Sequence, residues 1–87
     1  MCGPMKATVL VINHQRGMVA AQTIDGDYVI FEILGDYDVE IGHVVSHHDF
    51  TSMGSEKYRN LSTEETMDVY VQNVCATVEQ AKKQCLF

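Results

Sequence analysis

The hydrophobic positions of this chain alternate with a period of two over most of its length, which predicts β-strands. The clearest pair is formed by the apolar runs 17–24 and 27–34, which are separated by Asp25-Gly26. Asp-Gly between two such runs is typical of a β-hairpin, because a type I′ turn needs positive φ at both central positions. Both runs are apolar on both faces. We therefore expect this hairpin in a closed or covered sheet and not at a solvent-exposed edge.

Three further strands are predicted, at 6–13, 43–50 and 67–74. In the first strand, Ala7, Val9 and Val11 are expected to share one face, and Lys6 and Thr8 the opposite face. A turn at 14–17, with a glycine available for positive φ, leads into the hairpin. The stretch 51–66 has no periodicity, so we expect a long polar connection that could hold a short strand around 58–61.

A short helix is predicted after residue 74, where the period changes. Thr77 with Gln80 three residues later is a capping-box pattern, so we expect the helix to begin near Thr77. Val78, Ala81 and Cys85 then fall at helical spacing on one face. The chain is expected to form a single domain, 1–87, with a barrel at about 5–74 and a C-terminal helix at about 77–85.

Five sequential strands with a longer connection before the fifth favour a small, five-stranded β-barrel, with the helix covering one opening or edge. The same strand pattern could also build an SH3-like barrel. Eighty-seven residues leave no room for a second core.

Charge is unevenly spread along the chain. The net charge is −6, and the stretch 17–55 has no lysine or arginine but seven acidic residues. Nucleic-acid affinity comes largely from basic groups, so this acidity argues against nucleic-acid binding. No apolar run reaches the about 18 residues of a membrane span, and the first residues lack a secretory signal, so no membrane contact is expected. Cys2, Cys75 and Cys85 are too few for a disulfide framework; Cys75 and Cys85 are expected to be buried in a cytoplasmic protein.

Three segments carry a family resemblance. Lys6, Thr8, Val9 and Asn13 have the spacing Lys-x-Thr-Val-x-x-x-Asn, RGMVAA follows at 16–21, and DYVIFE stands at 27–32. In these segments, over about residues 6–46, the chain resembles the cold-shock domain, an OB-fold module that binds single-stranded nucleic acid. The resemblance implies a five-stranded, OB-like (cold-shock-like) barrel, to which the SH3-like barrel is the alternative, and a binding face on the first three strands.

The residues at the stacking positions of that family differ in this chain. Val11 stands where the family has tryptophan, and Met18 and Ala20 stand where it has phenylalanines. Stacked bases contribute about 1–3 kcal/mol each to single-strand binding, so their loss weakens the family's activity here. Arg16 keeps the basic position, and Tyr28 or Phe31 could stack if they face outward.

His43, His47, His48 and Asp49 form the densest group of metal-ligand residue types. On a strand, His43, His47 and Asp49 would share one face. No Cys-x-x-Cys or His-Glu-x-x-His pattern accompanies them, so solvent-facing or structural histidines are favoured and neither a metal nor a cofactor is predicted. No nucleophile, base and orienting group are placed together by a motif, so no enzyme activity is expected.

The sequence therefore predicts a non-enzymatic binding module that engages protein, either a second copy or another chain, through the barrel face or the helix. The alternative is binding of single-stranded RNA or DNA on the first three strands, with help from Lys57 and Arg59. The candidate residues of the partner or nucleic-acid face are Lys6, Asn13, His14, Arg16, Met18, Tyr28 and Phe31.

Overall fold

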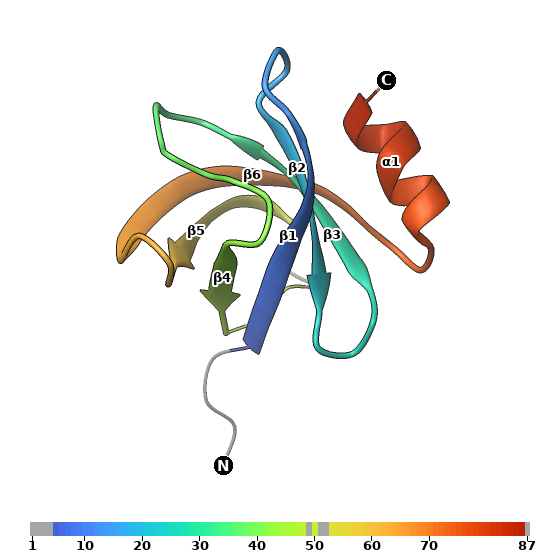
Figure 1. Cartoon of the computed structure of the whole chain (residues 1–87), viewed down its shortest axis with the longest axis horizontal. Helices are drawn as coiled ribbons and strands as arrows, with labels where there is room; N and C mark the ends of the chain where they lie inside the picture. The colour runs from blue at the N-terminus through green and yellow to red at the C-terminus, as the bar shows by residue number, and fades with distance from the viewer. Residues whose placement is uncertain (1–4, 49, 51–52, 87) are drawn as a thin grey trace.

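The computed structural model of the chain is a closed β-barrel with one helix packed against its outside (Figure 1). The structure describes residues 5–48, 50 and 53–86. The elements are β1 (Met5–Asn13), β2 (Met18–Thr23), β3 (Tyr28–Ile33), β4 (Val44–His47), β5 (Gly54–Asn60), β6 (Glu65–Cys75) and α1 (Val78–Leu86).

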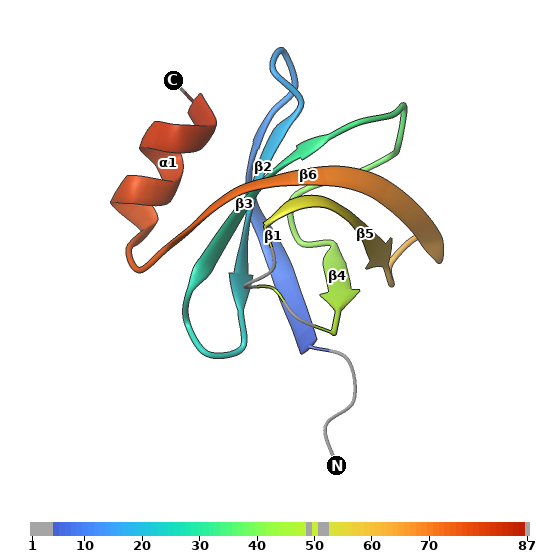
Figure 2. The same ribbon diagram turned by 180° about the vertical axis from the view of Figure 1, so that it is seen from behind.

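The barrel is built from two three-stranded meanders, β1–β2–β3 and β4–β5–β6. The strand order around the barrel is β1-β2-β3-β6-β5-β4, and β1 pairs with β4 to close it. Every pair is antiparallel. Figure 2, seen from behind, shows β6 crossing the near side of the barrel, where it pairs with both β3 and β5. A small β-barrel with a C-terminal helix is thus confirmed, with six strands where five were expected.

The additional strand is β5. The prediction of a short strand around 58–61 located its end, but the strand begins at Gly54. Its inward positions include Glu56, Tyr58 and Asn60, of which Tyr58 alone is a large hydrophobic residue. An apolar period of two is therefore invisible in this strand, although the strand is paired along its whole length with β6.

The β2–β3 hairpin is confirmed, but its turn differs from the predicted type I′. Gly26 has φ of 93°, whereas Asp25 has no positive φ. The Thr23 N–H donates to the Asp27 carbonyl (2.7 Å), and the Gly26 N–H donates to the Thr23 carbonyl (3.0 Å). This longer loop, with glycine in the left-handed region at its third residue, is the next most common way to join two antiparallel strands.

The barrel interior is filled by aromatic and branched side chains from all six strands. Phe31 and Tyr58 meet edge to face with ring centroids 4.9 Å apart, and Phe50 meets Tyr58 in the same way at 5.1 Å. The buried members of this core are Ala7, Val9, Val19, Ala21, Val29, Phe31, Val39, Val45, Phe50, Tyr58, Met67, Val69 and Val71.

A β-bulge divides β1 into two halves that face different partners. Val9 pairs with Ala21, but Val11 pairs with Ala20, so Leu10 is the extra residue. Val9 consequently points into the barrel, while Val11 packs on the outside with Ala20 and α1. The prediction that Val11 shares a face with Ala7 and Val9 is wrong, because the inserted residue reverses the alternation.

Helix α1 covers the outer face of β1, β2 and β3, as Figure 1 shows. It begins where the sequence predicts, since the Thr77 hydroxyl accepts the Gln80 N–H (3.3 Å) as a helix cap. Ala81 and Cys85 face the strands and are buried. The expectation that the central hairpin is covered on both faces is thereby confirmed. No helix in the described part of the chain is long and apolar enough to cross a membrane.

Candidate functional site

The predicted binding face on β1–β3 lies under α1. Val11, Met18 and Ala20, which occupy the stacking positions of the cold-shock resemblance, all pack in the apolar cluster beneath the helix. Met18 is 6% exposed. Small and aliphatic side chains suit this position because a helix must approach the strands closely. The buried members of the cluster are Met18, Ala20, Ile30, Cys75, Ala81 and Cys85.

Asn13 ties the end of α1 to the β1–β2 turn. Its Nδ2 donates to the Cys85 carbonyl near the helix end (3.1 Å), and its Oδ1 accepts the N–H groups of Gln15 (3.1 Å) and Arg16 (3.4 Å). A helix C-terminus leaves carbonyls without partners, and this amide satisfies one of them. The structure therefore gives Asn13 a structural role at the position predicted for ligand contact.

Phe31 is not on a binding face. It is fully buried among the barrel core residues, so the suggestion that it could stack on a base is wrong. Its neighbour Ile30 points outward instead and lies under the helix. The alternation along β3 was visible in the sequence, but both faces of the strand are apolar, so the pattern could not tell inside from outside.

The remaining candidates of this face are spread over the surface. Lys6 is exposed near the start of β1, and His14 is exposed in the β1–β2 turn. Tyr28 is half-buried against the cluster under α1. Arg16 lines a cleft of about 440 Å³ beside the helix together with Met18, Glu32, Gln72, Lys83 and Gln84. The structure thus places Arg16 near a second cation, Lys83, which the sequence did not connect with it.

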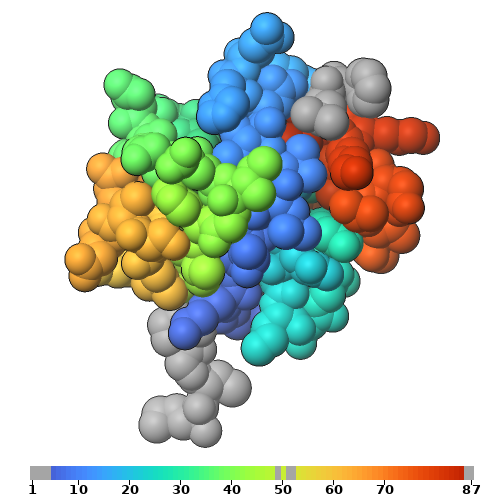
Figure 3. All heavy atoms as spheres, viewed as in Figure 1, coloured from blue at the N-terminus to red at the C-terminus, as the bar shows by residue number. Residues whose placement is uncertain are grey.

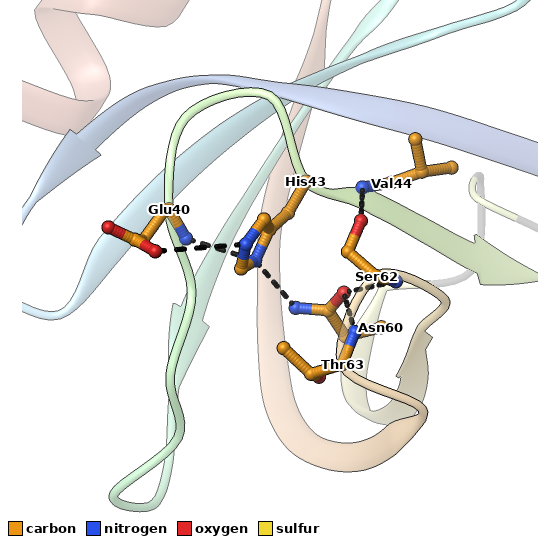
Figure 4. A network of polar contacts seen from close by, with 6 residues as sticks. All are labelled: Glu40, His43, Val44, Asn60, Ser62 and Thr63. Carbon is orange, nitrogen blue, oxygen red and sulfur yellow. Dashed lines mark hydrogen bonds and ion pairs between the residues drawn. The ribbon is translucent and has the colours of Figure 1, made fainter.

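The histidines predicted to share a metal-binding face have separate surroundings. Figure 4 shows His43 in a polar network that joins the loop before β4 to the turn after β5. Its Nδ1 accepts the Glu40 N–H (3.2 Å) and lies 3.1 Å from Asn60 Nδ2. Asn60 Oδ1 accepts the Ser62 N–H (2.9 Å), and the Ser62 hydroxyl accepts the Val44 N–H (3.1 Å). This network fixes the two loops to each other.

His47 points toward the barrel interior, where its Nε2 lies 2.9 Å from Glu56 Oε1. The ring of His48 stacks on it with centroids 4.3 Å apart. Asp49 lies outside the described residues. Within the described ranges, no group of three or more histidine, cysteine, aspartate or glutamate residues is arranged to hold a metal ion.

A second cleft, which the sequence did not predict, opens beside these histidines. Its volume is about 710 Å³, and Lys57 and Asp68 line it as an exposed ion pair. The hydrogen bond between them raises the pKa of Lys57 and lowers that of Asp68. The full lining is Leu34, His47, His48, Ser55, Glu56, Lys57, Asp68 and Val69. Since β5 was not recognised over its full length, the pairing of Lys57 with Asp68 could not be predicted.

Both described thiols belong to the cluster under the helix. Burial raises the pKa of Cys75 and of Cys85 above the ordinary value of 9.0. The Gln84 side chain donates to Cys75 Sγ (2.9 Å), and the Cys85 thiol donates to the Met18 carbonyl (3.3 Å). The expectation that these cysteines are buried is confirmed.

We predict that iodoacetamide alkylates Cys75 and Cys85 slowly at pH 8 in the folded protein and rapidly in urea, because the thiolate is the reactive form. The raised pKa values also predict a stability change. Below pH 9.0 the protonated thiols contribute their full stability, and this contribution is lost as the pH rises through the folded-state pKa values. Mass spectrometry and urea unfolding at pH 7 and pH 10 measure both effects. Equal alkylation rates in native buffer and in urea would contradict the prediction.

The outer face on the β1–β4 side remains open. Figure 3 shows β1 (blue) beside the segment that contains β4 (yellow-green), with α1 (red) at the margin of this view. Thr8 pairs with Val44, and the Leu61 N–H donates to the Val44 carbonyl (2.7 Å), so these three side chains form one row across the strands. We call the row and its exposed apolar neighbours the β1–β4 surface: Thr8, Leu10, Ile24, Ile41, Val44 and Leu61.

This surface was absent from the predicted site. Seven large hydrophobic side chains are exposed among the described residues, and four of them (Leu10, Ile24, Ile41 and Leu61) belong to the β1–β4 surface. Thr8, Ile24 and Val44 line a shallow groove of about 320 Å³ along it. The alternation along β1 signalled that Thr8 faces outward, but the pairing of β4 and the bulge at Leu10 were needed to bring the apolar residues together.

Comparison with known proteins finds no matching family model, no matching curated protein and no matching solved structure. The resemblance to the cold-shock domain therefore stays a prediction.

Proposed function

We propose that the chain is a non-enzymatic binding module for a protein partner. The observation that carries this proposal is the β1–β4 surface, where exposed Ile24 lines one groove with Thr8 and Val44. Exposed Leu61 lies beside Val44, and the backbone bond from Gly42 to Val9 brings the segments of Ile41 and Leu10 together. Exposed apolar patches with a polar rim are typical of protein interaction sites. A reducing cytoplasm is the proposed location, in keeping with free thiols at Cys75 and Cys85.

Binding of single-stranded nucleic acid is the second candidate, and the cleft lined by Arg16 and Lys83 favours it. It would preserve the function that the cold-shock and OB-fold resemblance implies. Two features weigh against it. The stacking positions lie under α1, and Glu32 lines the same cleft as the two cations. We therefore rank it below a protein partner.

Two assays on the purified chain separate these functions. We expect fluorescence anisotropy with short single-stranded RNA and DNA to detect no salt-sensitive binding, because the stacking positions lie under α1 and Glu32 lines the cleft that holds Arg16 and Lys83. We expect the immobilised chain to capture a protein from a cell lysate, and Leu61→Glu to lose it. Tyr70→Glu is the control, because Tyr70 is 44% exposed on β6, away from the β1–β4 surface.

Two results would overturn the protein-binding proposal. One is micromolar nucleic-acid binding that weakens steeply with salt and disappears in Arg16→Ala, which would restore the second candidate. The other is a captured protein that Leu61→Glu and Tyr70→Glu retain equally, which would move the contact away from the β1–β4 surface.

A further inference from the structure

The β1–β4 surface carries opposite charges at its two ends. Lys6 and Arg59 are the cross-strand neighbours of Ser46, one on each side, so both cations lie two residues along the strands from the row, at one end of the surface. Glu40 lies toward the other end, because the Gly42 N–H donates to the carbonyl of Val9, beyond Thr8 on β1, and its side chain is 71% exposed. The row of Thr8, Val44 and Leu61 lies between these ends.

Such a surface is complementary to itself. In a dimer with two-fold symmetry, the same patch is used by both copies, and each contact occurs twice. A two-fold axis that runs along this row, across the strands, makes the strands of the second copy point in the opposite direction. Lys6 and Arg59 of one copy then face Glu40 of the other, while Val44 and Leu61 meet their own counterparts.

The net charge of the chain favours this reversed arrangement over arrangements without charge pairing. Each copy carries a charge of −6, so association without charge pairing would bring like charges together. The reversed arrangement places the cations of the surface against the exposed carboxylate and avoids that repulsion. A dimer interface of standard size buries about 800 Å² per partner, about one-sixth of the 5114 Å² surface of this chain.

We propose that the β1–β4 surface binds a second copy of this chain about a two-fold axis, with Lys6 and Arg59 of each copy facing Glu40 of the other. This inference rests on the proposed protein-binding function and names its partner. It also offers a contact to Leu10 and Ile41, which are 37% and 68% exposed in the single chain.

Sedimentation velocity over a concentration series tests the proposal with the full chain. The wild type should approach twice its monomer mass of 9.8 kDa as its concentration rises. Lys6→Glu and Glu40→Lys should each weaken the dimer by about tenfold or more, because each reversal acts twice in a symmetric interface. The double variant Lys6→Glu/Glu40→Lys should dimerise again, since the charges have exchanged places.

Lys82→Glu is the matched control, because it makes the same charge change as Lys6→Glu at an exposed position on α1. It should dimerise like the wild type. Circular dichroism of each variant establishes that the barrel is folded.

Three results would overturn the dimer: a wild type that stays monomeric, single reversals that leave association unchanged, or single reversals that the double variant does not rescue. A monomeric wild type that still captures a different protein through Leu61 would refute the dimer and leave the protein-binding function standing. Loss of both would refute both.

Discussion

Replacing Phe31 by alanine should lower the free energy of unfolding by about 3–5 kcal/mol, because the substitution leaves a cavity in the barrel core. Phe31 is fully buried and meets Tyr58 edge to face, and Tyr58 in turn meets Phe50. At about 0.05–0.15 kcal/mol per residue, a domain of 87 residues has a total stability of about 4–13 kcal/mol. The expected loss is a large part of it. Urea unfolding followed by far-UV circular dichroism measures the change.

Two further variants keep this prediction decisive. Phe31→Leu retains most of the apolar volume and should lose clearly less stability, which remains measurable if Phe31→Ala does not fold. Tyr70→Ala removes an aromatic ring that is 44% exposed on β6 and should cost less than about 1 kcal/mol. Equal losses for Phe31→Ala and Tyr70→Ala would contradict the position of Phe31 in the core.

The second large effect concerns the contact between α1 and the barrel. Ala81 is fully buried against the strands, so Ala81→Glu would place a carboxylate in the apolar cluster. Burial of an unpaired charge costs several kcal/mol, which exceeds what Ala81 and Cys85, the two small side chains that the described part of α1 buries, can offset. We expect the helix to detach and the barrel to persist.

A detached helix uncovers Met18 and Ile30 and frees the two thiols. Binding of the dye ANS should increase, and alkylation of Cys75 and Cys85 at neutral pH should accelerate by about tenfold or more, since each 1.4 kcal/mol changes an equilibrium tenfold. Lys82→Glu adds the same group one residue later, where it is exposed, and should leave both readouts unchanged. Accelerated alkylation in Lys82→Glu as well would show that any added charge loosens the helix.

The sequence predicted the features that depend on local pattern. Apolar residues on both faces of 17–24 and 27–34 predicted a covered hairpin, and Thr77 with the helical spacing after it predicted α1. These predictions hold because alternation and capping are decided within a few residues. The sequence pattern could not predict that α1 covers this hairpin, because the helix could equally have packed on another face of the barrel.

The features that the sequence did not predict depend on pairing between distant strands. The bulge at Leu10 appears only when β1 is aligned with β2, and it sends Val11 to the outside. Most of β5 went unseen because Glu56 and Asn60 occupy inward positions that are usually apolar. The β1–β4 surface is likewise formed by β1, β4 and the residue after β5, so no single segment of the sequence could predict it.

The two meanders also bear on how the chain folds. Contacts within β1–β2–β3 and within β4–β5–β6 link residues close in sequence, so either half can begin to form at a small cost in loop-closure entropy. The shared core joins the halves, because Phe31 from β3 needs Tyr58 from β5. We expect the meeting of the halves to set the folding rate, as non-local pairing does in other β-proteins. Helix α1 follows β6 in the chain but packs on β1–β3, so its docking is a further contact between the two halves, and we expect it to accompany or follow their meeting.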